Sequence, residues 1–149
     1  MQEFSMKDIF PIIEEGIKNG GNYRFYPKGE SMLPLIREGI DSVVLAEVDN
    51  VNKFDMVLYQ RADESYVLHR VVKVEKDAFS ICGDNQCSVE RGIKAEQIKA
   101  KVIAFYRGEE YVSTDDPRHI KYAKERAASI PIRLLKARIK GIIKKIKGR

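Results

Sequence analysis

The chain has 149 residues, of which 44% are hydrophobic and 33% are charged. This length accommodates one domain and a short appendage, and the composition belongs to a folded globular protein rather than a disordered one. With only two Cys and two His, the sequence excludes a disulfide-rich scaffold and argues against a four-ligand zinc site.

The net charge of +5 is unevenly distributed along the chain. Residues 118–149 contain 12 Lys or Arg and a single acid, Glu125, and therefore carry +11. Residues 1–117 contain 15 basic and 21 acidic residues and carry −6. A mildly acidic body followed by a strongly basic tail predicts that the tail is the part that meets an anionic partner.

The N-terminal segment predicts a short amphipathic helix over Ser5–Lys18, bounded by a stop at Asn19–Asn22. Ser5 and Asp8 form a capping box in which Asp replaces the usual Glu. Four isoleucines recur at helical spacing and are expected on one face: Ile9, Ile12, Ile13 and Ile17.

Residues 23–113 predict an all-β body, because short runs rich in Val, Ile, Tyr and Phe alternate with Gly, Asp, Asn and Lys. The expected strands are Tyr23–Tyr26, Ser42–Glu47, Asp55–Gln60, Tyr66–Val74, Ala78–Cys82 and Lys99–Tyr106. Their spacing is typical of coiled sheets or a small barrel. We therefore expect a mainly β fold with an N-terminal helix at 1–22, a β domain at 23–113 and a basic helical tail at 118–149.

The tail predicts one helix over His119–Ser129, with His119 exposed, and a second helix with Pro131 in its first turn. Five apolar side chains line one face of the second helix: Leu135, Ile139, Ile142, Ile143 and Ile146. A basic amphipathic helix favours an anionic membrane surface as partner. Packing of the apolar face on the body or on a second subunit is the alternative. Nucleic acid is disfavoured, because the tail offers only Tyr122 for base stacking.

A serine lies on a turn bounded by Gly and Pro, in the sequence GESMLP at 29–34. A serine becomes a nucleophile only if a base accepts its proton and donors stabilise the resulting oxyanion. Taken alone, Ser31 on such a turn predicts no more than a polar loop. Three further segments follow it: FDMV at 54–57, LHRVV at 68–72 and GDNQ at 83–86.

In this order and spacing, the four segments resemble the signature of the signal peptidase/LexA-like serine peptidase superfamily, across roughly residues 23–107. Because His69 directly precedes Arg-Val, the chain is similar to the histidine-base branch of archaeal and endoplasmic-reticulum signal peptidases. The resemblance implies the superfamily's coiled β-sheet domain and a serine endopeptidase activity that needs no metal or cofactor. Ser31 would be the nucleophile and His69 the general base, with activity rising through about pH 6–7.

A histidine base of this kind requires a carboxylate that fixes its tautomer and stabilises the imidazolium ion. Asp84 and Glu90 are the two candidates. In the histidine branch the orienting acid lies six residues beyond the Asp of GDN and precedes Arg-Gly, which is the position of Glu90. The resemblance therefore favours Glu90 slightly, although the family residue is Asp, and Asp84 alternatively holds the turn that builds the site.

The residues around Ser31 depart from ordinary signal peptidases. Gly29 stands where these enzymes often have a hydroxyl group, so the resemblance implies an oxyanion hole built on backbone N–H groups, chiefly that of Ser31. By this resemblance Met32 and Pro34 would line the substrate cleft, although Met32 taken alone favours a core position. The Gly-Asp that follows the nucleophile segment appears as Gly39-Ile40-Asp41, and the glycine of the second Gly-Asp is replaced by Phe54.

No apolar stretch approaches the about 20 residues that cross a bilayer, and no signal peptide is evident, so we expect a cytoplasmic protein, peripheral on the inner membrane face through its tail. Cys82 and Cys87 flank GDN and are expected to be ordinary reduced thiols rather than a redox staple. Substrates would be cytoplasmic peptides or leader segments, as in maturation of a peptide precursor. The alternatives are a non-catalytic peptide-binding or partner-binding member of the same fold, and a self-cleaving LexA-like regulator.

Overall fold

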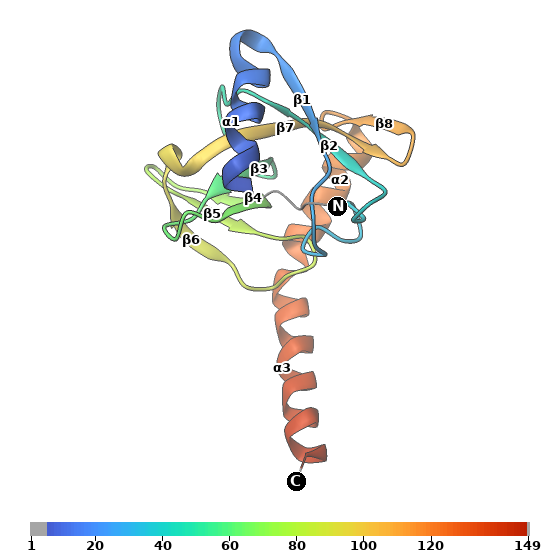
Figure 1. Ribbon diagram of the computed structural model, residues 1–149. Coiled ribbons are helices and arrows are strands. Elements are labelled where there is room, and N and C mark those ends of the chain that lie inside the picture. The colour runs from blue at the N-terminus through green and yellow to red at the C-terminus, as the bar shows by residue number, and fades with distance from the viewer. Residues whose placement is uncertain (1–5, 149) are drawn as a thin grey trace.

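The computed structural model describes residues 6–148 and contains an N-terminal helix, an eight-stranded antiparallel sheet and two C-terminal helices (Figure 1). Helix and strand each account for about a third of the chain. The expectation of a mainly β protein therefore holds for the body alone, because the two C-terminal helices contribute most of the helical residues.

The helices are α1 (Met6–Ile17), α2 (Pro117–Ala128) and α3 (Ile130–Lys147), with single 3₁₀ turns η1 (Lys18–Gly20) and η2 (Ala95–Gln97). The strands are β1 (Asn22–Phe25), β2 (Ser42–Ala46), β3 (Met56–Gln60), β4 (Tyr66–Val74), β5 (Phe79–Cys82), β6 (Glu90–Ile93), β7 (Ile98–Arg107) and β8 (Glu110–Ser113). The sequence analysis missed β6 and β8, which are short and lie largely exposed.

Helix α1 buries Phe10, Ile13 and Ile17 against the sheet. Ile12, which was expected on the same face, is 62% exposed, and Phe10 fills the apolar face in its place. The capping box that involves Ser5 lies outside the described residues.

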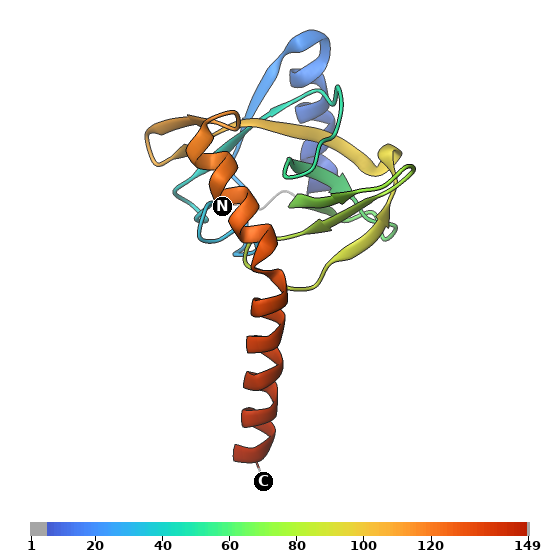
Figure 2. The same ribbon diagram turned by 180° about the vertical axis from the view of Figure 1, so that it is seen from behind.

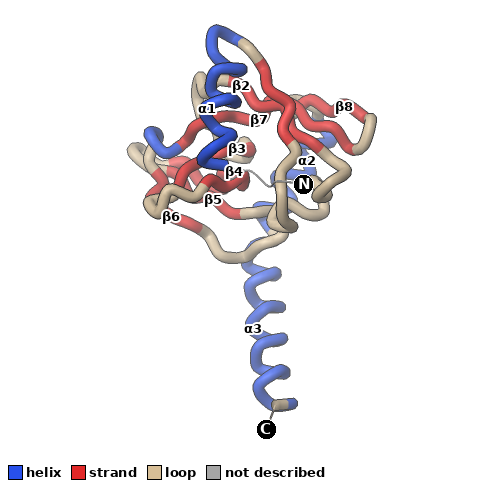
Figure 3. Tube along the Cα trace, in the orientation of Figure 1, coloured by secondary structure: helices blue, strands red, loops and turns tan. Residues whose placement is uncertain are grey.

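The strands follow the order β1-β2-β7-β3-β4-β5-β6, and β8 pairs with β7. Register shifts interrupt the pairing of β2 with β7, β3 with β7, β4 with β5 and β5 with β6. Such bulges bend a strand and increase its local twist. The sheet therefore coils around its core instead of lying flat (Figure 3).

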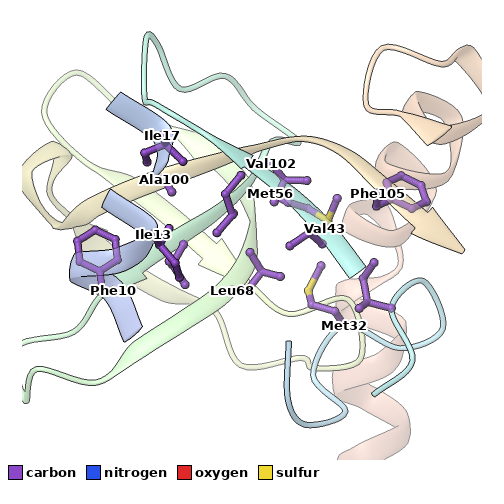
Figure 4. Packing of buried hydrophobic residues seen from close by; sticks show 13 residues of the cluster. Phe10, Ile13, Ile17, Met32, Val43, Met56, Leu68, Ala100, Val102 and Phe105 are labelled. Atoms are coloured by element: carbon purple, nitrogen blue, oxygen red, sulfur yellow. The ribbon is translucent and has the colours of Figure 1, made fainter. Parts of the chain in front are cut away.

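The two faces of the coiled sheet bury separate apolar clusters, because neighbouring residues of a strand point to opposite faces. The larger cluster lies beneath α1 and includes Met32 from the loop before β2 (Figure 4). The second cluster contains Val57, Tyr59, Val71, Ile81, Ile93 and Ile98. His69 is the antiparallel partner of Val57, which places it on the side of this second cluster.

Helix α2 begins at Pro117, where Asp116 caps it by accepting a hydrogen bond from the backbone N–H of Arg118. It packs on the body through Ala123 and His119, both buried. The expectation that His119 is exposed was therefore wrong. Its ring lies 5.0 Å from that of Phe105, centroid to centroid, within a packing contact that the local sequence of charged residues does not reveal.

Helix α3 continues from α2 and, beyond its first turns, projects away from the body (Figures 1 and 2). It contains no buried residue. No helix among residues 6–148 is long and apolar enough to cross a membrane.

The buried His119 makes stability depend on pH. Burial, together with the nearby charge of Arg70, lowers the pKa of His119 from 6.5 to about 4. The stability conferred by the neutral ring is therefore fully present above pH 6.5 and is lost as the pH falls towards 4, since the unfolded chain binds the proton more readily. We measure the free energy of unfolding in urea between pH 6 and 4.5. We expect its slope against pH to be smaller by about 1 kcal/mol per pH unit in His119→Phe than in the unmodified protein. An unchanged slope would contradict the assignment.

Candidate active site

Ser31 lies on the loop between β1 and β2, which crosses the body as a series of tight turns. Gly29 has φ +88°, a conformation that favours glycine, and its missing side chain would meet open space. Gly29 therefore supplies a turn geometry, and no close contact requires a glycine at this position. Backbone bonds from Leu33 N–H to Glu30 C=O and from Ile36 N–H to Met32 C=O close the turns that follow.

The far end of this loop is anchored by Asp41, which is fully buried. Its carboxylate accepts hydrogen bonds from the backbone and side chain of Arg37 and from the backbone N–H of Gly108. Burial alone would raise the pKa of Asp41, but these bonds outweigh it and lower the pKa to about 2. Arg107 also donates from Nη1 to the carbonyl oxygens of Pro34 and Leu35, at 2.6 Å each. Both interactions fix the loop to β7 and the turn after it.

The turn at 83–86 connects the Ser31 loop to the rest of the site. Asn85 donates its backbone N–H to the carbonyl oxygen of Ser31 at 2.9 Å and its side-chain amide to the carbonyl oxygen of Glu30 at 3.1 Å. The Sδ atom of Met32 accepts from the backbone N–H of Asp84 at 3.4 Å. Met32 is a buried member of the larger core cluster, in agreement with the core position considered from the sequence, and Pro34 is exposed.

Gly83 marks the point at which the Ser31 turn and His69 meet. A Cβ atom at Gly83 would lie 2.7 Å from the carbonyl oxygen of Ser31 and 3.1 Å from Cδ2 of His69. The first of these distances is impossible for a real side chain, so only glycine allows this approach. Within residues 6–148, the Oγ atom of Ser31 makes no hydrogen bond to the His69 ring.

The two nitrogens of His69 have different surroundings. Nδ1 lies 3.3 Å from the hydroxyl oxygen of Tyr59. Nε2 makes no hydrogen bond within the described residues. Among residues 6–148, the only side-chain nitrogen or oxygen that is both fully buried and without a hydrogen bond is Nδ1 of His119. Nε2 of His69 is therefore not fully buried and remains partly accessible. The free nitrogen therefore belongs to the edge of the ring that includes Cδ2 and faces Gly83.

Tyr59 stands between His69 and Glu90. Its hydroxyl donates to Oε1 of Glu90 at 2.9 Å, and Arg61 holds the same carboxylate with a hydrogen bond of 2.9 Å from Nε. A phenol hydroxyl can donate only one hydrogen bond, and Tyr59 donates it to the Glu90 carboxylate. The contact with His69 must then run from Nδ1–H to the phenol oxygen, which leaves Nε2 with the lone pair of a base. Burial and the contact with Glu90 raise the pKa of Tyr59, so it stays protonated.

Glu90 thus reaches His69 only through a hydroxyl group, and direct contact between the two, as the sequence analysis expected of the orienting acid, is absent within the described residues. Burial opposes the charge of Glu90, but the hydrogen bonds from Arg61 and Tyr59 lower its pKa overall. Burial of His69, strengthened by the positive charge of Arg61, lowers the pKa of His69 from 6.5 to about 4. The ring is therefore neutral across the physiological range.

Asp84 is engaged elsewhere. Its carboxylate accepts from Nε of Arg70 at 2.8 Å and from Nη2 of Arg70 at 2.9 Å, and the hydroxyl of Tyr122 donates to it at 2.8 Å. Both members of the ion pair are buried, with side chains 1% and 2% exposed. This agrees with the alternative that Asp84 holds the turn. It does not act on His69 through a hydrogen bond.

Tyr59, Arg61 and Arg70 were not predicted from the sequence as parts of the site. In the β3–β4 hairpin, Val57 pairs with His69, so Tyr59 lies diagonally across on the same face. Aligning the two strands as a hairpin would have exposed this relation.

The two cysteines beside the 83–86 turn form no disulfide. Cys82 and Cys87 are both free thiols, and burial raises the pKa of Cys82. No group of three or more His, Cys, Asp or Glu side chains is arranged to hold a metal ion between residues 6 and 148. Comparison with known proteins gave no matching family model, no similar curated protein and no similar solved structure.

The charges around His69 predict how its pKa responds to mutation. Removing the positive charge in Arg61→Gln leaves Glu90 unpaired, so we expect the pKa of His69 to rise by about one unit or more, measured by NMR titration of the imidazole. Arg91→Gln, which removes a neighbouring but exposed charge, is the matched control and should leave the titration in place. The His119 signal serves as an internal reference. A His69 titration near 6.5 in the unmodified protein would contradict the site geometry.

Proposed function

We propose that this protein is a serine endopeptidase related to the signal peptidase/LexA-like superfamily, with Ser31 as nucleophile and His69 as general base. One observation carries the proposal: the Ser31 turn and the His69 ring converge on Gly83, with Nδ1 held by a carboxylate-backed tyrosine and Nε2 free. The proposal is also supported by the sequence motifs, because three of them supply Ser31, His69 and Gly83, whereas Tyr59, Arg61 and Glu90 lie outside them.

Two backbone conformations add support. The superfamily signature has glycine at the position of Phe54, and Phe54 here has φ +79°, a left-handed conformation that costs a bulky residue energy. Hydrogen bonds hold it there, from its N–H to Val71 C=O at 2.7 Å and from Nη1 of Arg70 to its own carbonyl at 2.8 Å. Gly39, in the other Gly-Asp position, has φ +76°.

The chemistry follows from these roles. His69 Nε2 accepts the proton of Ser31 Oγ as that oxygen attacks the peptide carbonyl, and the resulting imidazolium then protonates the departing amine. The backbone N–H of Ser31, which donates to no acceptor within residues 6–148, suits the developing oxyanion. Water hydrolyses the acyl-enzyme by the reverse proton transfers. Glu90, acting through Tyr59, stabilises the imidazolium without binding it.

An extended peptide fits the outer side of the sheet. Strand β1 is an edge strand, paired with β2 alone, so its free edge is open to an added strand. The chain continues from β1 directly into the Ser31 loop. A pocket of about 210 Å³ with mainly apolar walls lies between this segment, helix α1 and the β3–β4 hairpin. Its lining includes Phe25, Tyr26, Lys28, Leu58, Tyr66 and Leu68. It would accept an apolar side chain of the substrate.

The proposal is tested by peptide-library cleavage read by mass spectrometry. We expect Ser31→Ala and His69→Ala each to lose about 10³-fold or more of the activity. Ser88→Ala, an exposed serine beyond the 83–86 turn, is the matched control and should cleave normally. Cleavage that survives in both variants would remove the pair from the mechanism. Peptide binding without cleavage by any form would instead favour the non-catalytic member of this fold, and a change in the protein's own mass would reveal self-cleavage.

The hydroxyl of Tyr59 has its own signature. Tyr59→Phe keeps the ring but removes the link between Glu90 and His69, so we expect kcat to fall about 10- to 100-fold with little change in KM. Far-ultraviolet circular dichroism should show an unchanged fold. Full activity in Tyr59→Phe would show that His69 needs no such partner.

The low pKa of His69 changes the expected pH dependence. Since the ring deprotonates at about 4, kcat/KM should rise with pH along an acid limb below pH 5.5, rather than through pH 6–7 as the sequence alone predicts. Arg61→Gln should move this limb to higher pH, because the imidazolium is then less disfavoured. A limb that stays near pH 6.5 in both proteins would contradict the assignment of His69 as a buried base.

A further inference from the structure

Helix α3 carries an apolar face that nothing in the described chain covers. Its large apolar side chains are between 46% and 67% exposed: Ile132, Leu135, Ile139, Ile142, Ile143 and Ile146. At 3.6 residues per turn they fall within an arc of about 100°. In the two opposite views of Figures 1 and 2, the helix projects away from the body. Packing of this face on the body, one alternative raised by the sequence, does not occur.

Basic residues border this face, and the helix contains no acid. Helical geometry places Lys136 and Lys147 along one edge of the apolar arc and Arg138 and Lys145 along the other side. In all, α3 contains seven Lys or Arg within Ile130–Lys147. The helix is therefore an apolar stripe between two cationic margins.

Three kinds of partner differ in whether they bury the apolar stripe and neutralise the basic margins. Pairing two copies of α3 would bury the stripe but align lysines against lysines, with no acid to neutralise them. A nucleic-acid duplex would neutralise the lysines but leave six apolar side chains in water. The surface of an anionic bilayer satisfies both, because the apolar side chains enter the acyl boundary while the basic margins meet the headgroups.

We propose that α3 docks this protein onto anionic lipid bilayers, with the helix lying in the plane of the interface. The proposal is independent of the peptidase function, since it rests on α3 alone. It nevertheless bears on the candidate site. Arg133, in the first turns of α3, donates from Nη2 to the carbonyl oxygen of Gln86 at 2.7 Å, and Arg126 of α2 donates from Nε to the carbonyl oxygen of Asp84 at 3.0 Å. The base of the docking helix is thus bonded to the turn that contacts Ser31.

The test is co-sedimentation of the full chain with vesicles of phosphatidylcholine alone and of phosphatidylcholine with one quarter phosphatidylglycerol. We expect at least tenfold stronger partitioning into the anionic vesicles, weakened by 0.5 M salt. Ile139→Ser/Ile143→Ser should reduce this partitioning at least tenfold, since both side chains lie on the apolar stripe. Ala137→Ser/Gly141→Ser places the same two serines on the opposite, exposed face and should bind like the unmodified chain. Circular dichroism verifies that both variants remain helical.

Several results would overturn the proposal. One is the absence of anionic-vesicle binding, and another is equal binding by the two double variants. A dimer in lipid-free sedimentation velocity that Ile139→Ser/Ile143→Ser converts to a monomer would assign the stripe to a second copy. Binding of duplex DNA by the Ile139→Ser/Ile143→Ser variant, without vesicle binding by the unmodified chain, would assign the basic margins to nucleic acid.

Discussion

The buried ion pair between Arg70 and Asp84 is the interaction on which the rest of the structure depends. Burying two charges is costly, and their attraction offsets the cost only where hydrogen bonds satisfy the remaining donors and acceptors. Here the backbone carbonyl of Phe54 and the hydroxyl of Tyr122 complete the set. The pair therefore joins β4, the turn after β5, the segment before β3 and helix α2. Removing one partner would strand the other charge, a change that typically costs 3–5 kcal/mol, about the scale of a small domain's stability.

This ion pair explains why Asp84 and Glu90 have different hydrogen-bond partners. Asp84 pairs with Arg70, so it fixes the position of the 83–86 turn and makes no hydrogen bond to His69 within the described residues. That turn binds the carbonyl oxygen of Ser31 and, through the absence of a side chain at Gly83, admits the His69 ring. Glu90 accepts a hydrogen bond from Tyr59, whose hydroxyl oxygen lies against Nδ1 of His69. Burial, followed by the positive charge of Arg61, lowers the pKa of His69 and keeps its ring neutral, as the proposed general base requires.

The parts of the fold that local pattern specifies were predictable, and the parts that depend on long-range pairing were not. The central strands are continuous apolar runs, and α3 is an uninterrupted amphipathic repeat, so each could be located from sequence. Strands β6 and β8 have mostly exposed side chains and exist because β5 and β7 offer them an edge. The motif order led us to expect that the Ser31 turn and His69 lie close together, and both approach Gly83. The Tyr59 link required the register of a hairpin, and the burial of His119 required its packing partner Phe105, neither of which is encoded by neighbouring residues.

We propose that His69 activates Ser31 for covalent chemistry. This is tested by the intact mass of the protein, quenched in acid during reaction with an activated peptide ester, followed by mapping of the modified residue. We expect an acyl adduct on Ser31 that is lost in His69→Ala. An adduct that forms equally without His69, or that maps to a different residue, would contradict it.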